Sequence, residues 1–249
     1  MGEDQDKLPP LEGWQSQIAE LRRRANWEYI ANERHDLRKS WHTLIGHFAA
    51  PDVAGDVDSS PASHWYKTLE SAYQSRGRHY HNLDHSRQML SWIAYSWNDT
   101  WETCLIAKYA AWFHDAVYDS TRSDNEERSA ELAVDAASQL QVPASIAEPA
   151  ATWILCTKGH QAADSPACAH FLDCDLAILG GPEELYRQYA AAIRAEYAWV
   201  AEDAYRHGRS KLLAHFLSRD RIYAVDQMAG KLEVQARWNL QKEIRLLAV

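Results

Sequence analysis

The pair His114–Asp115 is the first place in this sequence where side chains could do chemistry. It occurs in the segment AAWFHDAVYD, where Trp, Phe and Val surround the carboxylate. Burying a carboxylate without a positive partner is costly, yet no Lys or Arg occurs between Lys108 and Arg122. A metal cation would satisfy both side chains. The alternative is a His–Asp pair that caps a helix end or bonds to a neighbouring group.

Two further segments carry metal-ligand side chains in apolar surroundings. His85 has Asp84 beside it and His81 four residues before it, and Asp173 and Asp175 lie in the apolar run FLDCDLAILG. Two carboxylates in such a run need a cation or strong hydrogen-bond donors. Together with the His–Asp pair, these segments offer a mixed nitrogen and oxygen ligand set. Such a set suits Mn, Fe, Co, Ni or Zn, with open positions for water and substrate.

Helices must position these side chains, because helical spacing recurs along the chain and no alternating strand pattern stands out. Only ten Gly and eight Pro occur in 249 residues, so few residues interrupt the helical pattern. His81, His85, Met89 and Trp92 share one helical stripe, and residues 123–126 have the form of a capping box. Residues 50–63 read as a loop. The predicted helices cover about 14–26, 37–49, 64–77, the stretch after RHYHNLDH, 101–117, 123–140, 146–157, 182–206 and 231–247.

The chain reads as one all-α domain, a single helical bundle over residues 13–249, after a disordered tail at 1–12. No internal repeat and no long linker divides it. Eleven Trp and twelve Tyr are expected mainly in the core. No run of 18 apolar residues predicts a membrane span. The acidic amino terminus does not read as a signal peptide, and four cysteines without a C-x-x-C pair fit a reducing cytoplasm.

The ordered pattern H…HD…D, with HD on a buried helix and the last Asp in Asp-x-Asp, resembles the HD superfamily of metal-dependent phosphohydrolases. The words RHYHNLDHSRQML, AAWFHDAVYDSTRSDNEERSAELA and FLDCDLAILG closely resemble a bacterial branch of predicted HD phosphohydrolases, as do IRAEY and ARWNLQKEI. The resemblance covers about residue 38 to the end and implies an HD-type helical bundle. The sequence differs from the family pattern in two ways. Leu176 follows the last Asp, where many relatives have a basic or polar residue, and the GYP motif of cyclic-dinucleotide phosphodiesterases is missing.

The resemblance also implies the ligand set. His85, rather than His81, matches the first metal ligand, because a small residue follows it. The remaining ligands it implies are His114, Asp115 and Asp175.

Catalytic and substrate-binding roles are expected for residues around that set. Asp115 or Asp173 could hold the attacking water, and His160 could protonate the leaving oxygen or act as a further ligand. His160 could equally be an exposed loop residue. Arg78 is the expected phosphate clamp, since a guanidinium can hold two oxygens at once. The other expected substrate contacts are His81 and Lys158.

The expected function is hydrolysis of a small phosphate ester or nucleotide, with a divalent ion (Mn, Fe, Co, Ni, Zn or Mg) as cofactor and the identity of that ion left open. Two alternatives remain: a di-iron HD-type oxygenase, in which His160 and His170 would supply extra ligands, and a non-catalytic, metal-stabilised ligand-binding module. The net charge of −9 argues against a nucleic-acid partner. The oligomeric state stays open.

Overall fold

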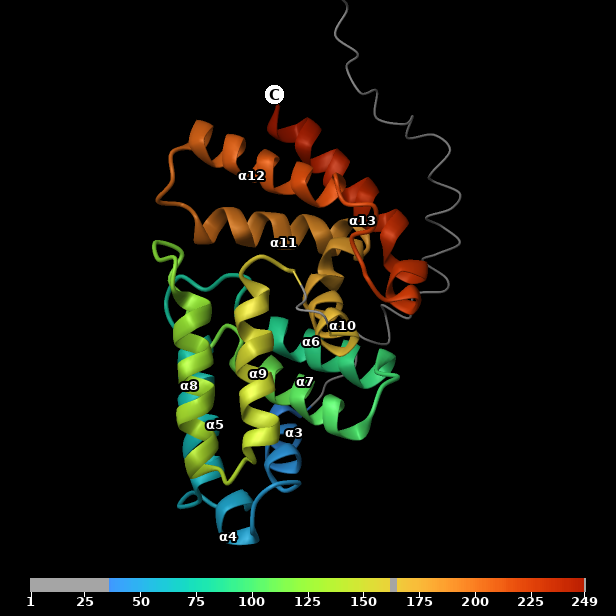
Figure 1. Cartoon of the computed structure of the whole chain (residues 1–249). Helices are drawn as coiled ribbons and strands as arrows, with labels where there is room; N and C mark the ends of the chain where they lie inside the picture. Colours follow the sequence, from blue (N-terminus) through green and yellow to red (C-terminus); the bar gives the residue numbers. More distant parts are fainter. Residues whose placement is uncertain (1–35, 162–164, 249) are drawn as a thin grey trace, which may run out of the picture.

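The structure, a computed structural model, describes residues 36–161 and 165–248, and every regular element in them is helical (Figure 1). The all-α, single-bundle prediction is therefore confirmed for this part of the chain. The predicted tail at 1–12 and the predicted helix at 14–26 lie outside the described residues. In chain order the elements are α3 (Leu37–Ile45), α4 (Pro51–Ala54), α5 (Pro61–Tyr73), α6 (Leu83–Ser96), α7 (Trp101–Phe113), α8 (Asn125–Gln139), α9 (Ala144–Thr157), α10 (Pro166–Asp175), the 3-10 turn η2 (Leu176–Gly180), α11 (Glu183–Glu196), α12 (Glu202–Leu217) and α13 (Asp226–Leu247).

Helix α7 lies in the core of the bundle, as expected for a helix that is apolar almost all round. Trp112 and Tyr109 of this helix are fully buried. Trp41 of α3 packs edge-on against Trp112, with ring centroids 5.3 Å apart. Tyr109 donates a hydrogen bond to the carbonyl of Ala133 in α8 at 2.7 Å, and Tyr73 of α5 donates to the carbonyl of Trp112 at 3.2 Å. Aromatic side chains thus build the core, and their hydroxyls tie neighbouring helices to it.

Helices α11, α12 and α13 form a second layer that crosses the ends of α8 and α9 (Figure 1). Helix α13 packs against α12 and against η2. Its Asn239 side chain donates to the carbonyls of Leu179 and Gly181 at 2.8 and 2.9 Å. The approach is close, because a β-carbon at Gly180 would lie 2.6 Å from that of Leu232. The turn η2 therefore fixes the second layer to the first. No described helix is long and apolar enough to cross a membrane.

The predicted helix over 182–206 is two helices, α11 and α12, with a turn between them. The Arg194 guanidinium holds this turn by donating to the carbonyls of Tyr197 at 2.7 Å and Val200 at 3.3 Å. The second of the two helices, α12, runs on past Gly208 to Leu217. The helical spacing misled the prediction because Tyr197 and Val200 still face the interior, where they line a cavity from the turn.

Four other predicted boundaries are wrong. The predicted loop over 50–63 contains α4 and the start of α5, where Ser60 caps the helix and Pro61 takes its first position, a place that suits proline. The predicted capping box does not form, because Asp124 is the N-cap of α8 and its side chain makes no capping bond. The helix predicted over 101–117 ends at Phe113, and the one predicted from 231 begins at Asp226.

Candidate metal centre

His85 reaches the site from the first turn of α6. Asn82 caps this helix, accepting a hydrogen bond from the backbone N–H of Asp84 at 2.9 Å. The His85 side chain is buried, and its ring lies against that of Tyr80 with centroids 4.6 Å apart. His81 precedes the helix and lies in the turn before it, so the expected common helical stripe does not extend back to His81. The helix start thus fixes the direction of His85 alone.

His114 and Asp115 reach the site because α7 ends at Phe113 and His114 is its C-cap. His114 Nδ1 lies 3.0 Å from the carbonyl oxygen of Ala111. A carbonyl can only accept, so Nδ1 carries a proton in this bond, and in the neutral ring Nε2 therefore has the lone pair. A hydrogen bond of this kind, on the ring nitrogen that faces away from the metal, fixes the tautomer of histidines that bind metals. The chain turns directly after the helix, which brings the Asp115 carboxylate beside His114.

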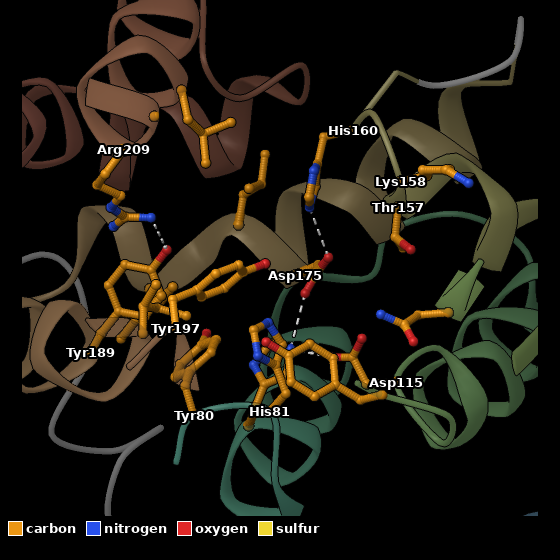
Figure 2. A pocket seen from close by; sticks show the side chains of 18 of the residues that line it. Tyr80, His81, Asp115, Thr157, Lys158, His160, Asp175, Tyr189, Tyr197 and Arg209 are labelled. Carbon is orange, nitrogen blue, oxygen red and sulfur yellow. Dashed lines mark hydrogen bonds and ion pairs between the residues drawn. The ribbon is translucent and has the colours of Figure 1, made fainter. Parts of the chain in front are cut away.

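Asp175 approaches from the point where α10, which packs against α6, α7 and α9, ends and η2 begins. Its two carboxylate oxygens face different histidines. Oδ1 lies 3.0 Å from His85 Nε2, and Oδ2 lies 3.1 Å from His160 Nε2 (Figure 2). The change from α-helix to 3-10 turn thus places one carboxylate between a buried histidine and a partly exposed one.

These donors converge at metal-binding distances. Within the described residues, His85, His114 and Asp175 form a group whose ligand atoms all lie within 4.8 Å of one another. His85 Nε2 and His114 Nε2 are 3.0 Å apart. Asp115 Oδ2 lies 3.0 Å from His114 Nε2 and 3.7 Å from His85 Nε2. Two donors that each lie about 2.1 Å from a metal, at right angles, are about 3.0 Å apart. This side-chain group could therefore hold a metal ion.

The charges of the site are coupled. Burial raises the pKa of the Asp115 and Asp175 carboxyl groups. The histidines around them lower it by a larger amount, so both pKa values lie well below the usual range. Burial lowers the pKa of His114, but the charge of Asp115 outweighs this effect and raises that pKa to about 9. The carboxylates are thus held ionised, as metal binding requires, whereas His114 has to release a proton when a metal binds.

His160, the predicted acid or additional ligand, does lie at the site. Its backbone adopts a left-handed conformation with φ of 46°. Arg219 holds this loop by donating to the carbonyl oxygens of His160 at 3.1 Å and Gly159 at 3.3 Å. The ring then points at Asp175 (Figure 2). His160 is therefore held by contacts on its backbone and on its ring, unlike the exposed loop residue of the alternative interpretation.

Glu196 is a site residue that the sequence interpretation missed. Its Oε1 accepts three backbone hydrogen bonds, from His79, Tyr80 and His81, at 2.7 to 2.9 Å. Its Oε2 accepts from His81 Nδ1 at 2.6 Å and from the Tyr118 hydroxyl at 2.8 Å. Burial raises its pKa, but the bond to and charge of His81 and the backbone donors lower it to about 2. The only signal for Glu196 was its place in the word IRAEY.

His81 lines the cavity, as its predicted role in substrate binding requires. Its ring stacks on that of Tyr118 with centroids 4.3 Å apart. Burial lowers its pKa, but the charge of Asp115 and the bond to Glu196 outweigh that effect and raise it. Since Nδ1 is engaged by Glu196, Nε2 is the atom that His81 can offer to a ligand.

Arg78, the expected phosphate clamp, has a different role. Its guanidinium donates to the backbone carbonyls of His81, Asp115 and Ala116 at 3.0, 2.5 and 2.9 Å, and to the Ser75 hydroxyl at 3.0 Å. It is not among the cavity-lining residues. Four of its five N–H donors are therefore committed, and Arg78 joins the turn before α6 to the turn after α7. The guanidinium positions the metal-ligand segments from behind.

Asp173 and Lys158 also differ from expectation. Asp173 accepts from the backbone N–H groups of Ala224 at 2.9 Å and Val225 at 2.8 Å, at the start of α13. Burial raises its pKa to about 7, and it does not line the cavity. Its predicted role near the water is therefore wrong. Lys158 does line the cavity, but its ammonium group contacts Glu127 and the carbonyl of Ser123.

His170, offered as an additional ligand for a di-iron centre, lies outside the site. Its ring stacks on Trp97 with centroids 4.6 Å apart, and its Nε2 lies 2.9 Å from the hydroxyl of Ser96. It does not line the cavity. His170 is therefore not placed to act as a ligand of the second iron in that alternative.

The ligand group opens into a cavity of about 550 Å³ between the two helical layers. Figure 2 shows Asp115, Asp175, His81 and His160 in its middle. Lys158 lies to one side of them, and Tyr189 and Tyr197 lie to the other. A cavity of this size is typical of small-molecule sites.

Comparisons of the chain with protein-family models, with curated proteins and with solved structures found no match.

Proposed function

We propose that this chain is a metal-dependent phosphohydrolase of the HD type, acting on a small phosphate ester. One observation carries the proposal. Four oxygen and nitrogen donors, from His85, His114, Asp115 and Asp175, converge beside a cavity that is large enough for a small molecule. The resemblance of the sequence to HD phosphohydrolases rests on the same four residues and supports the choice of reaction.

His85, His114, Asp115 and Asp175 would hold one divalent ion. Such an ion supplies Lewis-acid chemistry: it lowers the pKa of water and neutralises charge on a phosphoryl group. Because the pKa values of Asp115 and Asp175 are lowered, both carboxylates are ionised at neutral pH. The ligand set is therefore anionic and suits a divalent cation.

Two histidines beside the ligand set have polar atoms directed at the cavity. His81 is fixed through Nδ1 by Glu196, so its Nε2 can donate to a phosphate oxygen. His160 is 3.1 Å from Asp175 and can deliver a proton to the leaving oxygen. Both roles require the imidazole rings to keep a fixed orientation, because a general acid must lie within hydrogen-bond reach of the leaving atom.

The test is phosphate release from a panel of phosphomonoesters after loading the protein with each of several divalent ions. We expect release that depends on the metal, that a chelator abolishes, and that His114→Ala reduces at least a hundredfold. The matched control is His64→Ala, an exposed histidine on α5. If the metal-loaded protein releases no phosphate from any ester in the panel, the proposal fails.

A further inference from the structure

We infer that the cavity selects phosphate monoesters of apolar alcohols and disfavours nucleoside di- and triphosphates. This inference rests on the proposed function and specifies its substrate class. The observation behind it is that the cavity has two chemically different ends. The candidate metal ligands lie between these ends, so the ester's phosphate and its alcohol would meet different surroundings.

The end formed by η2, α11 and α12 is apolar. In Figure 2, Tyr189 and Tyr197 lie on the side of Asp175 away from Lys158. The aliphatic and aromatic side chains of this end include those of Leu179, Ile193, Val200, Leu212, Leu213 and Phe216. A surface of this kind is stabilised by contact with an apolar ligand body, because each methylene group that leaves water contributes favourably.

Among the described lining residues, the one cation at the apolar end, Arg209, is already neutralised. Arg209 is buried, and its guanidinium donates to both carboxylate oxygens of Glu243 at 2.8 and 3.2 Å. It also donates to the hydroxyl of Tyr189 at 3.3 Å. A phosphate placed here would have to break a buried ion pair, which is costly. This end therefore suits an uncharged group.

The described residues at the other end offer no surplus positive charge for a polyphosphate chain. Of its described lining cations, Arg122 pairs with Asp124 and Lys158 pairs with Glu127. Glu126 also lines this end. A triphosphate carries several negative charges and needs matched cationic donors. Here each lining cation has a carboxylate partner, so one phosphoryl group at the metal ligands is the charge that the cavity accommodates best.

The test compares ethyl, butyl, hexyl and octyl phosphate with a nucleoside triphosphate on the metal-loaded protein. We expect kcat/KM for octyl phosphate to exceed that for ethyl phosphate at least about 50-fold, because each buried methylene contributes a factor of about two to four. We expect the nucleoside triphosphate to be turned over more slowly than hexyl phosphate. Equal or better turnover of ethyl phosphate or of the triphosphate would overturn the inference.

Leu212→Glu tests whether the apolar end is responsible. Leu212 is 46% exposed, so the substitution should be tolerated by the fold, and it places a charge beside the expected alkyl chain. The ratio of octyl to ethyl kcat/KM should fall at least about tenfold. Leu246→Glu is the matched control, because Leu246 is an exposed leucine of α13 that does not line the cavity. An unchanged ratio in Leu212→Glu would contradict the assignment.

A binding measurement separates this inference from the proposed function. Octylphosphonate cannot be hydrolysed, and calorimetry measures its affinity whether or not the protein is an enzyme. Tight binding that Leu212→Glu weakens, together with no phosphate release from any ester, would refute the hydrolase and support the ligand class. Phosphate release together with equal affinity for ethyl- and octylphosphonate would support the hydrolase and refute the ligand class.

Discussion

Glu196 shows how a single carboxylate can organise one wall of the site. It accepts hydrogen bonds from three consecutive backbone N–H groups and also from the His81 ring. These donors are far from Glu196 in sequence and belong to the turn that leads into α6. One buried side chain on α11 therefore fixes the turn before His85 and the orientation of His81.

Glu196→Gln should destabilise the protein by roughly 1–3 kcal/mol, because the amide keeps an acceptor for the backbone but cannot match the charge of His81. Chemical denaturation measures this loss. Glu184→Gln on the same helix is the control: its ion pair with Arg187 is exposed, so the change should stay within about 0.5 kcal/mol. Equal effects of the two substitutions would show that Glu196 has no special structural role.

The residue types of the candidate site could be read from the sequence, but not all of their directions. His85, His114, Asp115 and Asp175 were predictable because ligand-type side chains in apolar runs need partners. Arg78 was misplaced because its sequence position next to the histidines does not tell whether the guanidinium faces the cavity or backbone carbonyls. Glu196 was missed because its partners lie 78 to 117 residues away.

At the scale of elements, the buried pair of Arg209 and Glu243 joins α12 to α13 behind the apolar end of the cavity. The Tyr186 hydroxyl of α11 also contacts Glu243. Three helices thus meet at one carboxylate. The wall of the cavity depends on this junction, because Leu212, Leu213 and Phe216 lie on the same helix as Arg209.

Arg209→Met should cost about 3–5 kcal/mol in unfolding free energy, because it leaves the Glu243 carboxylate buried and unpaired. The double variant Arg209→Met, Glu243→Gln should recover part of that loss, since no buried charge then remains. Denaturation of both variants and of Arg187→Met, an exposed control, measures the difference. A double variant less stable than Arg209→Met would contradict this explanation.

His170 connects α10 to the end of α6 and gives the stability a pH dependence. Burial lowers its pKa to about 4, from 6.5 in an unfolded chain. Between these values the unfolded chain binds the proton more tightly, so the stability that the neutral ring provides above pH 6.5 is lost as pH falls toward 4. His170→Gln should therefore flatten the pH dependence of unfolding in this window. The same slope in both proteins would contradict the assignment.

Helix boundaries were the least predictable part of the elements. The α11–α12 turn keeps the helical spacing of apolar residues while Arg194 holds its carbonyls, so the pattern alone could not reveal the break. Pro61 stands at a helix start, and the composition of the surrounding residues suggested a loop. Both errors arise because local patterns do not record which tertiary contacts satisfy the backbone.

At the scale of the whole molecule, the all-α bundle followed from recurrent helical spacing and sparse Gly and Pro, and the structure confirms it for the described residues. The stacking of α11, α12 and α13 over the lower layer did not follow, because it depends on long-range contacts such as Asn239 with η2 (Figure 1). That stacking creates the cavity beside the candidate metal ligands. A metal held there would join α6, α10 and the end of α7, and would stabilise the folded state by mass action.

The metal content of the purified protein, after loading with a divalent ion and removal of the excess, tests the proposed metal site most directly. We predict one equivalent per chain in the wild type, with a raised melting temperature, and almost none in Asp115→Ala. Asp84→Ala, an exposed neighbour of His85, should retain one equivalent. A full equivalent of metal in Asp115→Ala, or none in the wild type, would contradict the account.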